Sequence, residues 1–380
     1  MTSLQSSPLP VVERLFEGRP IIAPTGSGWE SGVTFNSSAI LLTATEENIP
    51  VIRQLLGPDT PVRDIVVLHY RARPKEDPSF PFTRSYVGLS IHEPDLTPIR
   101  RFESPVLSPE SDFPDVRGAE DPRVTRLDGE WWMVYCGVAP FEDPDPLKSW
   151  LANVCIAKSN DLVNWTKLGA VPGTSGRGPV PVSNKDGVLF PDRIEGKVVM
   201  MHRPMHGDID TWETAIAIAD RPEGPYTDLG SVHGPDRSKG YFKSWTGAGA
   251  TPIKIGEGRY LSIEHTGNFV AGLQRKYVLD AFLYDFNDWD PTQPETLVRA
   301  RIDEFMGPET DFEVKGPFAE SVANVVFACG AYVYDGWLYL VYGGGDSFIL
   351  GARVRYDELV DELLRREAEL FDNDRIAVGA

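Results

Sequence analysis

The segment GAEDPRV, residues 118–124, places two carboxylates and a guanidinium around a single proline. It stands between an acidic, proline-rich loop, SPESDFPDVR, and TRLDGEWWMVYCGV, which alternates like a strand after a turn. Pro122 fixes its own φ and disfavours the αR region for the residue before it, so we expect Asp121 to be extended. Backbone stiffness would then aim this carboxylate, as a reacting group requires. The alternative is a surface turn in which Arg123 pairs with Glu120 or Asp121.

A second segment, NKDGVLFPDRIEGKVVMMHRP at 184–204, gathers positive charge. Lys185 precedes the apolar run VLF, and His202 and Arg203 end the apolar run KVVMMHRP. If the two runs pair as an antiparallel hairpin, the three side chains approach one another. Each of them alone is more often a surface residue or a satisfied core residue. Together, in an acidic protein, they form a candidate anion site.

Further polar residues interrupt otherwise apolar strand-like runs, namely Asn36, Arg71, His265 and Asp346. Metal binding is not indicated, because the six His are scattered and no HExxH, HxH or D-x-D-x-D-G pattern occurs. The glycines of GGGDSF follow a strand but introduce no helix, so they do not form a nucleotide-type phosphate loop. No GxSxG nucleophile motif occurs either.

Composition narrows the class of protein. The 37 Lys and Arg against 56 Asp and Glu give a formal net charge of −19, which argues against nucleic acid or an anionic membrane as a partner. Cys136, Cys155 and Cys329 lie in apolar runs without CxxC spacing, as buried thiols in a reducing compartment do. The N-terminus has no signal-peptide pattern, and no apolar run approaches the roughly 18 residues of a membrane span. We therefore expect a cytoplasmic protein.

Strand-like runs separated by turns dominate the chain, which has 35 Gly and 32 Pro. Pairs of apolar runs joined by a tight turn recur around 124–136, 187–202, 251–264 and 330–342. This rhythm predicts an all-β, five-bladed β-propeller with a repeat of roughly 60–70 residues. We expect one catalytic domain over 1–380, with an N-terminal extension at about 1–20 and an amphipathic helix at about 356–372. The alternative, a pair of β-sandwiches, is disfavoured because no linker-like composition divides the chain.

Several of these segments together resemble one known family. GAEDPRV, FNSSAI (35–40), the 184–204 block, GATPIK (249–254) and CGAYVYDGWLYLVYGGGDSFIL are similar to glycoside hydrolase family 130, the inverting β-mannoside phosphorylases and related β-1,2-mannosidases. The matching blocks run from about residue 15 to 355 in the family's order. The resemblance implies a five-bladed β-propeller and makes Asp121 the general acid, which acts through the mannose 3-hydroxyl. It implies no cofactor, with inorganic phosphate as co-substrate.

The resemblance also implies roles for the other polar residues. We expect the phosphate-binding residues to be Lys185, His202, Arg203, Lys167 and Tyr277. We expect the residues that bind the mannoside to be Asn36, Ser37, Arg71, Arg123, His265 and Asp346. Lys167 stands where phosphorylases often have Arg, which keeps the charge but loses the two-pronged grip on phosphate.

The preferred function is an inverting phosphorylase that converts a β-mannoside and phosphate to α-D-mannose 1-phosphate and a sugar acceptor. Phosphate is already an anionic nucleophile, whereas an inverting hydrolase needs a second carboxylate to deprotonate water. Glu264, in IEHTG where the family usually has Y-H-G, is the candidate base for a β-mannosidase, which is the first alternative. A non-catalytic carbohydrate-binding propeller is the second.

The acceptor side of the site falls on loops. The segments at 74–84, 140–150 and 205–212 are the expected walls of the +1 subsite. Tryptophans predicted to lie in loops beside polar residues could stack on a sugar ring; they are Trp29, Trp150, Trp212 and Trp245. We also expect a homo-oligomer, with the N-terminal segment and the C-terminal helix as subunit contacts.

Overall fold

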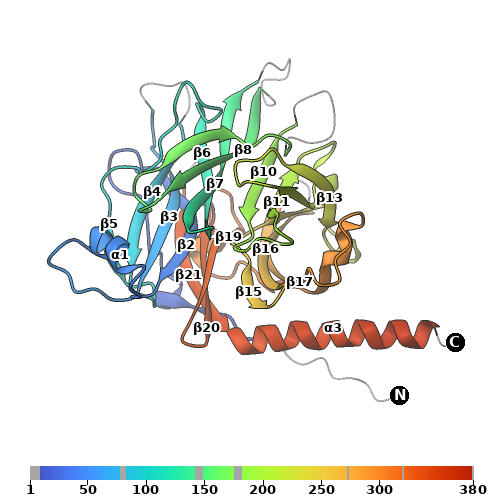
Figure 1. Cartoon of the computed structure of the whole chain (residues 1–380). Helices are drawn as coiled ribbons and strands as arrows, with labels where there is room; N and C mark the ends of the chain where they lie inside the picture. Colours follow the sequence, from blue (N-terminus) through green and yellow to red (C-terminus); the bar gives the residue numbers. More distant parts are fainter. Residues whose placement is uncertain are drawn as a thin grey trace.

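Short apolar runs between Gly- and Pro-rich turns fold into strands, whose side chains alternate between two faces. The computed structural model describes residues 9–77, 83–141, 149–174, 182–271, 274–318 and 321–378. Within these ranges the strands form five antiparallel sheets, and Figure 1 shows them arranged around a common centre as the blades of a propeller. The predicted five-bladed β-propeller is therefore confirmed.

The first three blades take their strands consecutively from the chain, and the first strand of each lies nearest the centre. The first blade contains β2 (Val33–Leu42), β3 (Ile65–Arg73), β4 (Tyr86–His92) and β5 (Pro98–Arg101). The second contains β6 (Gly118–Leu127), β7 (Glu130–Pro140), β8 (Trp150–Ser159) and β9 (Thr166–Ala170). The third contains β10 (Asn184–Leu189), β11 (Val198–Pro204), β12 (Thr214–Ala219) and β13 (Thr227–His233).

The last two blades depart from this simple order. The fourth contains β14 (Lys243–Ala248), β15 (Ile253–Gly256), β16 (Arg259–Ala271), β17 (Gln274–Asp285) and β18 (Val298–Met306), with both β14 and β15 paired to β16. The fifth contains β19 (Val326–Tyr334), β20 (Trp337–Gly344), β21 (Phe348–Arg355) and β1 (Glu13–Arg14). The helices described are α1 (Ile49–Leu56), α2 (Asp311–Val314) and α3 (Tyr356–Val378), besides short 3₁₀ turns.

Both faces of a blade are apolar because each blade packs against two neighbours. A cluster of buried side chains fills each gap between adjacent blades. Met133 of β7 packs towards the first blade and its neighbour Val134 packs towards the third, as strand alternation requires. Full burial of one such side chain contributes about 1.5–3 kcal/mol, so these layers hold the ring together.

The ring closes where the two ends of the chain meet. β1 pairs with β21, so a strand from the start of the chain forms the outer edge of the last blade. The segment expected as an N-terminal extension, about 1–20, thus belongs partly to the propeller, and residues 1–8 lie outside the described ranges. The expected C-terminal helix is present as α3, and it extends to Val378. Figure 1 shows α3 running along the edge of the molecule near β15 and β20.

The helices in the described part of the chain are too short or too polar to cross a bilayer.

The closing strand is fixed by one buried ion pair. Arg14 Nε lies 2.8 Å from Glu313 Oε1, and the Glu313 side chain is 0% exposed. We expect Arg14→Ala to lower the free energy of unfolding by about 3 kcal/mol, because it leaves a buried carboxylate without its cation. Urea unfolding followed by tryptophan fluorescence measures the change.

Glu13→Gln is the matched control for this prediction. Glu13 pairs with Arg353 on the surface of the same strand pair, where an ion pair contributes at most about 1 kcal/mol. Equal unfolding midpoints for the two variants would show that the Arg14 pair does not hold the closure.

Candidate active site

The innermost strands bring polar residues to the centre of the propeller by a repeated irregularity. β2, β6 and β10 each contain a bulge, and a residue with positive φ stands in each: Asn36 at 49°, Asp121 at 50° and Asp186 at 57°. A bulge adds one unpaired residue and re-aims its side chain. Asn and Asp tolerate the left-handed region better than other non-glycine residues do. Three blades therefore present an amide or a carboxylate in the same way.

The sequence-based prediction of an extended Asp121 is wrong. Its φ of 50° is left-handed, because the bulge between Glu120 and Arg123 determines the backbone here. The proline rule for the preceding residue is a preference, and the strand pairing on both sides overrides it. The backbone still directs the Asp121 carboxylate, but it does so through the bulge and not through an extended conformation.

Two donors hold the Asp121 carboxylate. Asn36 Nδ2 donates to Asp121 Oδ1 over 2.9 Å, and Arg71 Nη1 donates to the same oxygen over 3.1 Å. The structure places no described donor on Oδ2. Asp121 is 5% exposed, so its carboxylate is anchored by one oxygen within a nearly closed setting. Asn36, Asp121 and Arg71, all predicted site residues, thus meet at one point.

Beside this point, cations gather in a small cavity of about 340 Å³. Its lining residues are Arg71, Arg117, Glu120, Val138, Trp150 and Lys185. Glu120 Oε1 accepts from Arg71 over 2.5 Å, and Lys185 Nζ lies 3.1 Å from Glu120 Oε2. Burial alone would raise the pKa of Glu120, but the charges of Arg71 and Lys185 hold it at about 2. The cavity therefore contains an ionised carboxylate between fixed cations.

A second ionic group lies at the centre around Asp186. Arg123 Nη2 and Arg203 Nη1 each approach a carboxylate oxygen of Asp186 to 3.1 Å, and His265 Nε2 lies 3.4 Å away. Burial alone would raise the pKa of Asp186, but the charges of Arg203 and His265 hold it well below its ordinary value. Burial lowers the pKa of His265, against the charge of Asp186. Tyr277 stands near this group, with its ring centroid 6.2 Å from that of His265.

Arg123 connects neighbouring blades through its hydrogen bonds. It donates to the carbonyl oxygens of Asp121, Ala248 and Gly249 as well as to Asp186, and it is 1% exposed. Its donors are thus directed at protein groups in three blades. Arg123 thus contacts the backbone of Asp121, and its expected role in binding the mannoside stays a prediction.

Asp346 approaches from the fifth blade, in the turn between β20 and β21 with φ 47°. Burial raises its pKa to about 6, Arg71 opposes this rise, and the nearby charge of Asp121 adds to it. A carboxylate with this pKa exchanges a proton near neutral pH. The structure therefore brings a second titratable acid close to Asp121.

Three predicted site residues lie elsewhere. Lys167 is on the outermost strand of its blade, and its Nζ lies 2.7 Å from Asp115 Oδ2 and 3.1 Å from Glu110 Oε1. His202 is fully buried, with Nδ1 2.9 Å from Asn184 Nδ2. Ser37 donates to the backbone carbonyls of its own blade. The structure brings none of the three to the cavity.

The three-cation cluster predicted for the 184–204 hairpin is therefore divided. The strands pair as expected, with Lys185 opposite Arg203 in the register of β10 and β11. Lys185 joins the Glu120 cavity, however, while Arg203 joins Asp186. His202 precedes Arg203 by one residue, so it points to the opposite face of the strand.

Glu264 is not placed to activate water. It is 1% exposed on β16 of the fourth blade, and His233 Nε2 of β13 in the third blade lies 3.0 Å from its Oε2. Ser262 Oγ donates to Oε1 over 3.0 Å, and Tyr284 also donates to that oxygen. Burial alone would raise the pKa of Glu264, but His233 lowers it. The side chain of Glu264 is thus surrounded by protein groups on the face of β16 opposite to His265.

Sequence reasoning missed Arg117, whereas it had named Trp150 among the tryptophans that could stack on a sugar ring. Arg117 directly precedes the GAEDPRV segment and lines the cavity, with Nη1 donating to Ser149 over 3.1 Å. The Trp150 ring lies 5.7 Å from Lys185 Nζ. Adjacency to the acid motif was the available signal for Arg117. Of the other three tryptophans, Trp245 is 1% exposed and belongs to the core.

The loops expected as acceptor walls are described only in part. Residues 78–82 and 142–148 lie outside the described ranges, which leaves most of 140–150 and half of 74–84 without a structural account. The loop at 205–212 is described, and its Trp212 ring lies 5.7 Å from the Arg203 guanidinium carbon.

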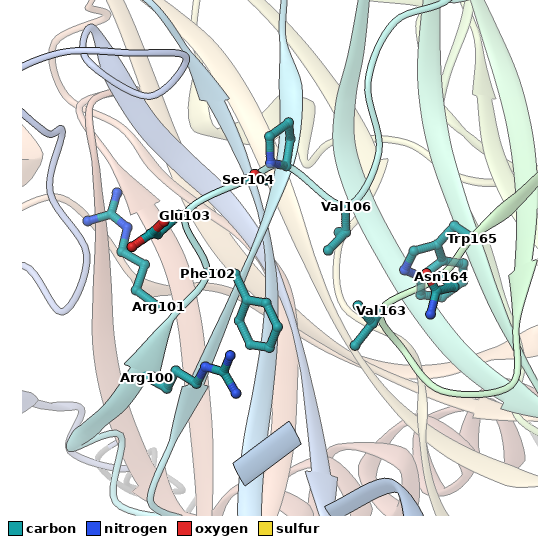
Figure 2. A pocket seen from close by; sticks show the side chains of 10 residues that line it. Arg100, Arg101, Phe102, Glu103, Ser104, Val106, Val163, Asn164 and Trp165 are labelled. Atoms are coloured by element: carbon teal, nitrogen blue, oxygen red, sulfur yellow. The ribbon is translucent and has the colours of Figure 1, made fainter. Parts of the chain in front are cut away.

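A larger cleft lies away from the site. This cleft of about 760 Å³ lies between residues 100–106, which begin at the end of β5, and residues 163–165, which precede β9. Figure 2 shows the side chains that line it. Phe102 and Trp165 stand on its two sides, and no carboxylate pair faces a cation group in it. The candidate active site is therefore chosen by the converging ions near Asp121 and not by volume.

In the described ranges, no three His, Cys, Asp or Glu side chains are grouped so as to hold a metal ion.

The ion pairs of Asp186 give a stability prediction. We expect Asp186→Asn to lower the free energy of unfolding at pH 7 by about 3–5 kcal/mol, because Arg123 and Arg203 lose their buried counter-charge. The folded-state pKa of Asp186 lies below the unfolded value of about 3.9, so its stabilisation is complete above that pH and is lost as the pH falls. The gap between wild type and variant should therefore narrow below about pH 4.

Urea unfolding at a series of pH values measures this gap. Asp220→Asn is the control, because Asp220 pairs with Lys197 while its side chain is 82% exposed. A loss of stability no larger in Asp186→Asn than in Asp220→Asn would contradict the prediction.

The chain is similar to known proteins in sequence and in fold. A family model described as beta-1,4-mannooligosaccharide phosphorylase, of glycoside hydrolase family 130, matches residues 64–365. A 1,2-beta-oligomannan phosphorylase of Thermoanaerobacter sp. (strain X514) is 33% identical over 266 residues, which cover 70% of this chain and 77% of that protein. A beta-1,2-mannobiose phosphorylase of the same strain is 29% identical over 276 residues, covering 72% and 78%.

A solved structure shows the same fold. The complex of beta-1,2-mannobiose phosphorylase from Listeria innocua with beta-1,2-mannobiose has a TM-score of 0.66 and 22% sequence identity, and the match covers 93% of this chain and 99% of that one. Because the family model spans well over half of the sequence and a relative is one-third identical, the chain belongs to glycoside hydrolase family 130.

Proposed function

We propose that the protein is an inverting β-mannoside phosphorylase that releases α-D-mannose 1-phosphate from the non-reducing end of its substrate. The observation that carries the proposal is a single anchored carboxylate, Asp121, beside a cavity with the cations Arg71, Arg117 and Lys185. The names of the relatives supply the substrate class.

The proposed reaction is one displacement. A phosphate oxygen forms a bond to the anomeric carbon while the glycosidic carbon–oxygen bond breaks, so the configuration inverts from β to α. Asp121 supplies the proton for the departing oxygen, by way of the mannose 3-hydroxyl as the family resemblance implies. Oδ1 is held by Asn36 and Arg71, which leaves Oδ2 for this transfer. Asn36 and Asp346 would hold mannose hydroxyls on either side.

The cations account for phosphate as nucleophile. Arg71, Arg117 and Lys185 line one cavity, and charge-assisted hydrogen bonds from such groups bind phosphate oxygens strongly. Holding phosphate in line with the anomeric carbon removes much of the entropic barrier to the displacement. Arg203 and Tyr277 lie in the adjacent group around Asp186 and would contact the sugar or the phosphate from there.

Hydrolysis is the weaker reading, because an inverting hydrolase needs a general base. Glu264 is enclosed between the third and fourth blades. Glu120 faces the cavity, but a carboxylate with a pKa of about 2 is a poor base near neutral pH. Neither glutamate is suited to deprotonate water.

The linkage is proposed from the relatives. The two Thermoanaerobacter proteins are named for β-1,2-linked mannosides, while the family description refers to β-1,4-linked ones. We therefore expect β-1,2-mannobiose or a β-1,2-oligomannoside to be a better substrate than its β-1,4 counterpart.

Phosphate dependence tests the function. We expect negligible sugar release in phosphate-free buffer, a rate that saturates as phosphate is added, and α-D-mannose 1-phosphate as the product seen by ³¹P NMR. Asp121→Asn should lower kcat by about 10²–10⁴, because the amide keeps the shape but donates no proton as an acid does. Asp112→Asn, in the exposed loop before the motif, is the control and should keep wild-type activity. Free mannose at an undiminished rate without phosphate would refute phosphorolysis.

The division of the hairpin cations gives a second test. We expect Lys185→Met to raise the KM for phosphate at least tenfold and the KM for the mannoside less, because Lys185 lines the cavity. His202→Gln should change the KM for phosphate less than twofold, since this side chain faces Asn184. Initial rates over a grid of both substrates separate the two constants. Equal effects of the two variants on phosphate would show that the cavity is not the phosphate site.

A further inference from the structure

Glu120 is bound by both of its carboxylate oxygens to cations of the cavity. Oε1 accepts from Arg71 over 2.5 Å, and Oε2 lies 3.1 Å from Lys185 Nζ. Ser85 Oγ is 3.4 Å from Oε1 and also accepts from Arg71 Nε over 2.9 Å. The side chains of Arg71 and Glu120 are 11% and 13% exposed. One glutamate thus joins a cation of the first blade to a cation of the third.

The opposite charges of Glu120 and the two cations stabilise one another. Two cations held close together in a poorly solvated cavity repel, and a buried charge without a partner is strongly unfavourable. Burial alone would lower the pKa of Lys185, but the charge of Glu120 raises it above its ordinary value. Arg71, Lys185 and Glu120 are therefore all ionised at neutral pH, and the carboxylate occupies the position of an anion.

We infer that Glu120 is the resident counter-anion of Arg71 and Lys185 and that its negative charge sets how tightly the enzyme binds phosphate. The inference rests on the proposed function, since it takes these cations as the phosphate site. A phosphate bound to the same two cations lies close to the Glu120 carboxylate, and the two like charges repel. Glu120 is a positioning residue, because it acts through Arg71 and Lys185 and has no part in bond making.

A phosphate site in which two cations attract the anion and Glu120 repels it suits a phosphorylase. The phosphate group of the substrate remains in the product, so cations that hold phosphate too tightly also delay the release of mannose 1-phosphate. Glu120 weakens the site for both. It also keeps Arg71 between two carboxylates, so that Nη1 stays 3.1 Å from Asp121 Oδ1. The same side chain thereby fixes the geometry of the acid and limits the affinity for the nucleophile.

Glu120→Gln tests the inference, because it removes the charge and keeps the shape. We expect the KM for phosphate to fall at least threefold, the KM for the mannoside to change less than twofold, and kcat to fall. Isothermal titration with inorganic phosphate alone should show the same gain in affinity, and the gain should shrink as ionic strength rises.

Two further variants make the test specific. Glu110→Gln removes one negative charge of the same blade away from the cavity, where the 55% exposed Glu110 pairs with Lys167, and should leave the KM for phosphate within twofold of wild type. Glu120→Asp keeps the charge and should also leave phosphate affinity within twofold, with a lower kcat because the shorter side chain cannot reach both cations. Glu120→Ser provides a second uncharged variant if the amide does not fold.

The outcomes separate the inference from the proposed function. If wild type requires phosphate but Glu120→Gln binds it no more tightly, the counter-anion role is overturned while phosphorolysis stands. A rise of both KM values together with a lower melting temperature would show a merely structural role and would also overturn it. If wild type needs no phosphate and binds none in the titration, the proposed function and the inference both fail.

Discussion

The buried ion pair between Arg123 and Asp186 is the constraint on which the centre of the molecule depends. Arg123 lies on the second blade, Asp186 on the third, and the carbonyl oxygens of Ala248 and Gly249 come from the fourth. A guanidinium in this position keeps its charge at any relevant pH and offers five donors in a fixed plane. It therefore sets the distance and the rotation of three blades relative to one another. Its further hydrogen bond to the carbonyl oxygen of Asp121 extends that order to the proposed acid.

Near the axis the chain is packed so closely that some positions have no room for a side chain. A Cβ on Gly247 would lie 2.2 Å from Asp186 Oδ2, and one on Gly249 would lie 2.3 Å from the carbonyl oxygen of Ile263. A Cβ on Gly343 would lie 2.3 Å from Asn36 Oδ1, the amide group that holds Asp121. These glycines allow polar side chains to fill the axis, where larger residues would push the blades apart. The glycines near the motifs are thus required for the packing of the site, as other glycines are required for the turns.

The sequence predicted the propeller, which the structure confirms, and the family resemblance indicated Asp121 as the general acid, which stays a prediction; both rest on local patterns. Alternating apolar runs with regular turns indicate blades, and GAEDPRV marks Asp121 within one segment. The placement of the cations depends on more distant contacts. His202 and Arg203 are neighbours in sequence but point to opposite faces of β11, so a motif that contains both does not bring both to the site. Lys167 is held by Asp115, a partner that no spacing rule identifies.

Local order at the axis explains how a protein of net charge −19 can present cations to an anion. Around the axis and the cavity, the five cations Arg71, Arg117, Arg123, Lys185 and Arg203 lie among the four carboxylates Glu120, Asp121, Asp186 and Asp346. The group as a whole is near neutral, so long-range attraction does not draw phosphate to it. Affinity must arise from short contacts at the cavity wall, where the dielectric constant is low and each charge counts strongly. In such a site the position of one carboxylate has more influence on anion binding than the charge of the entire surface.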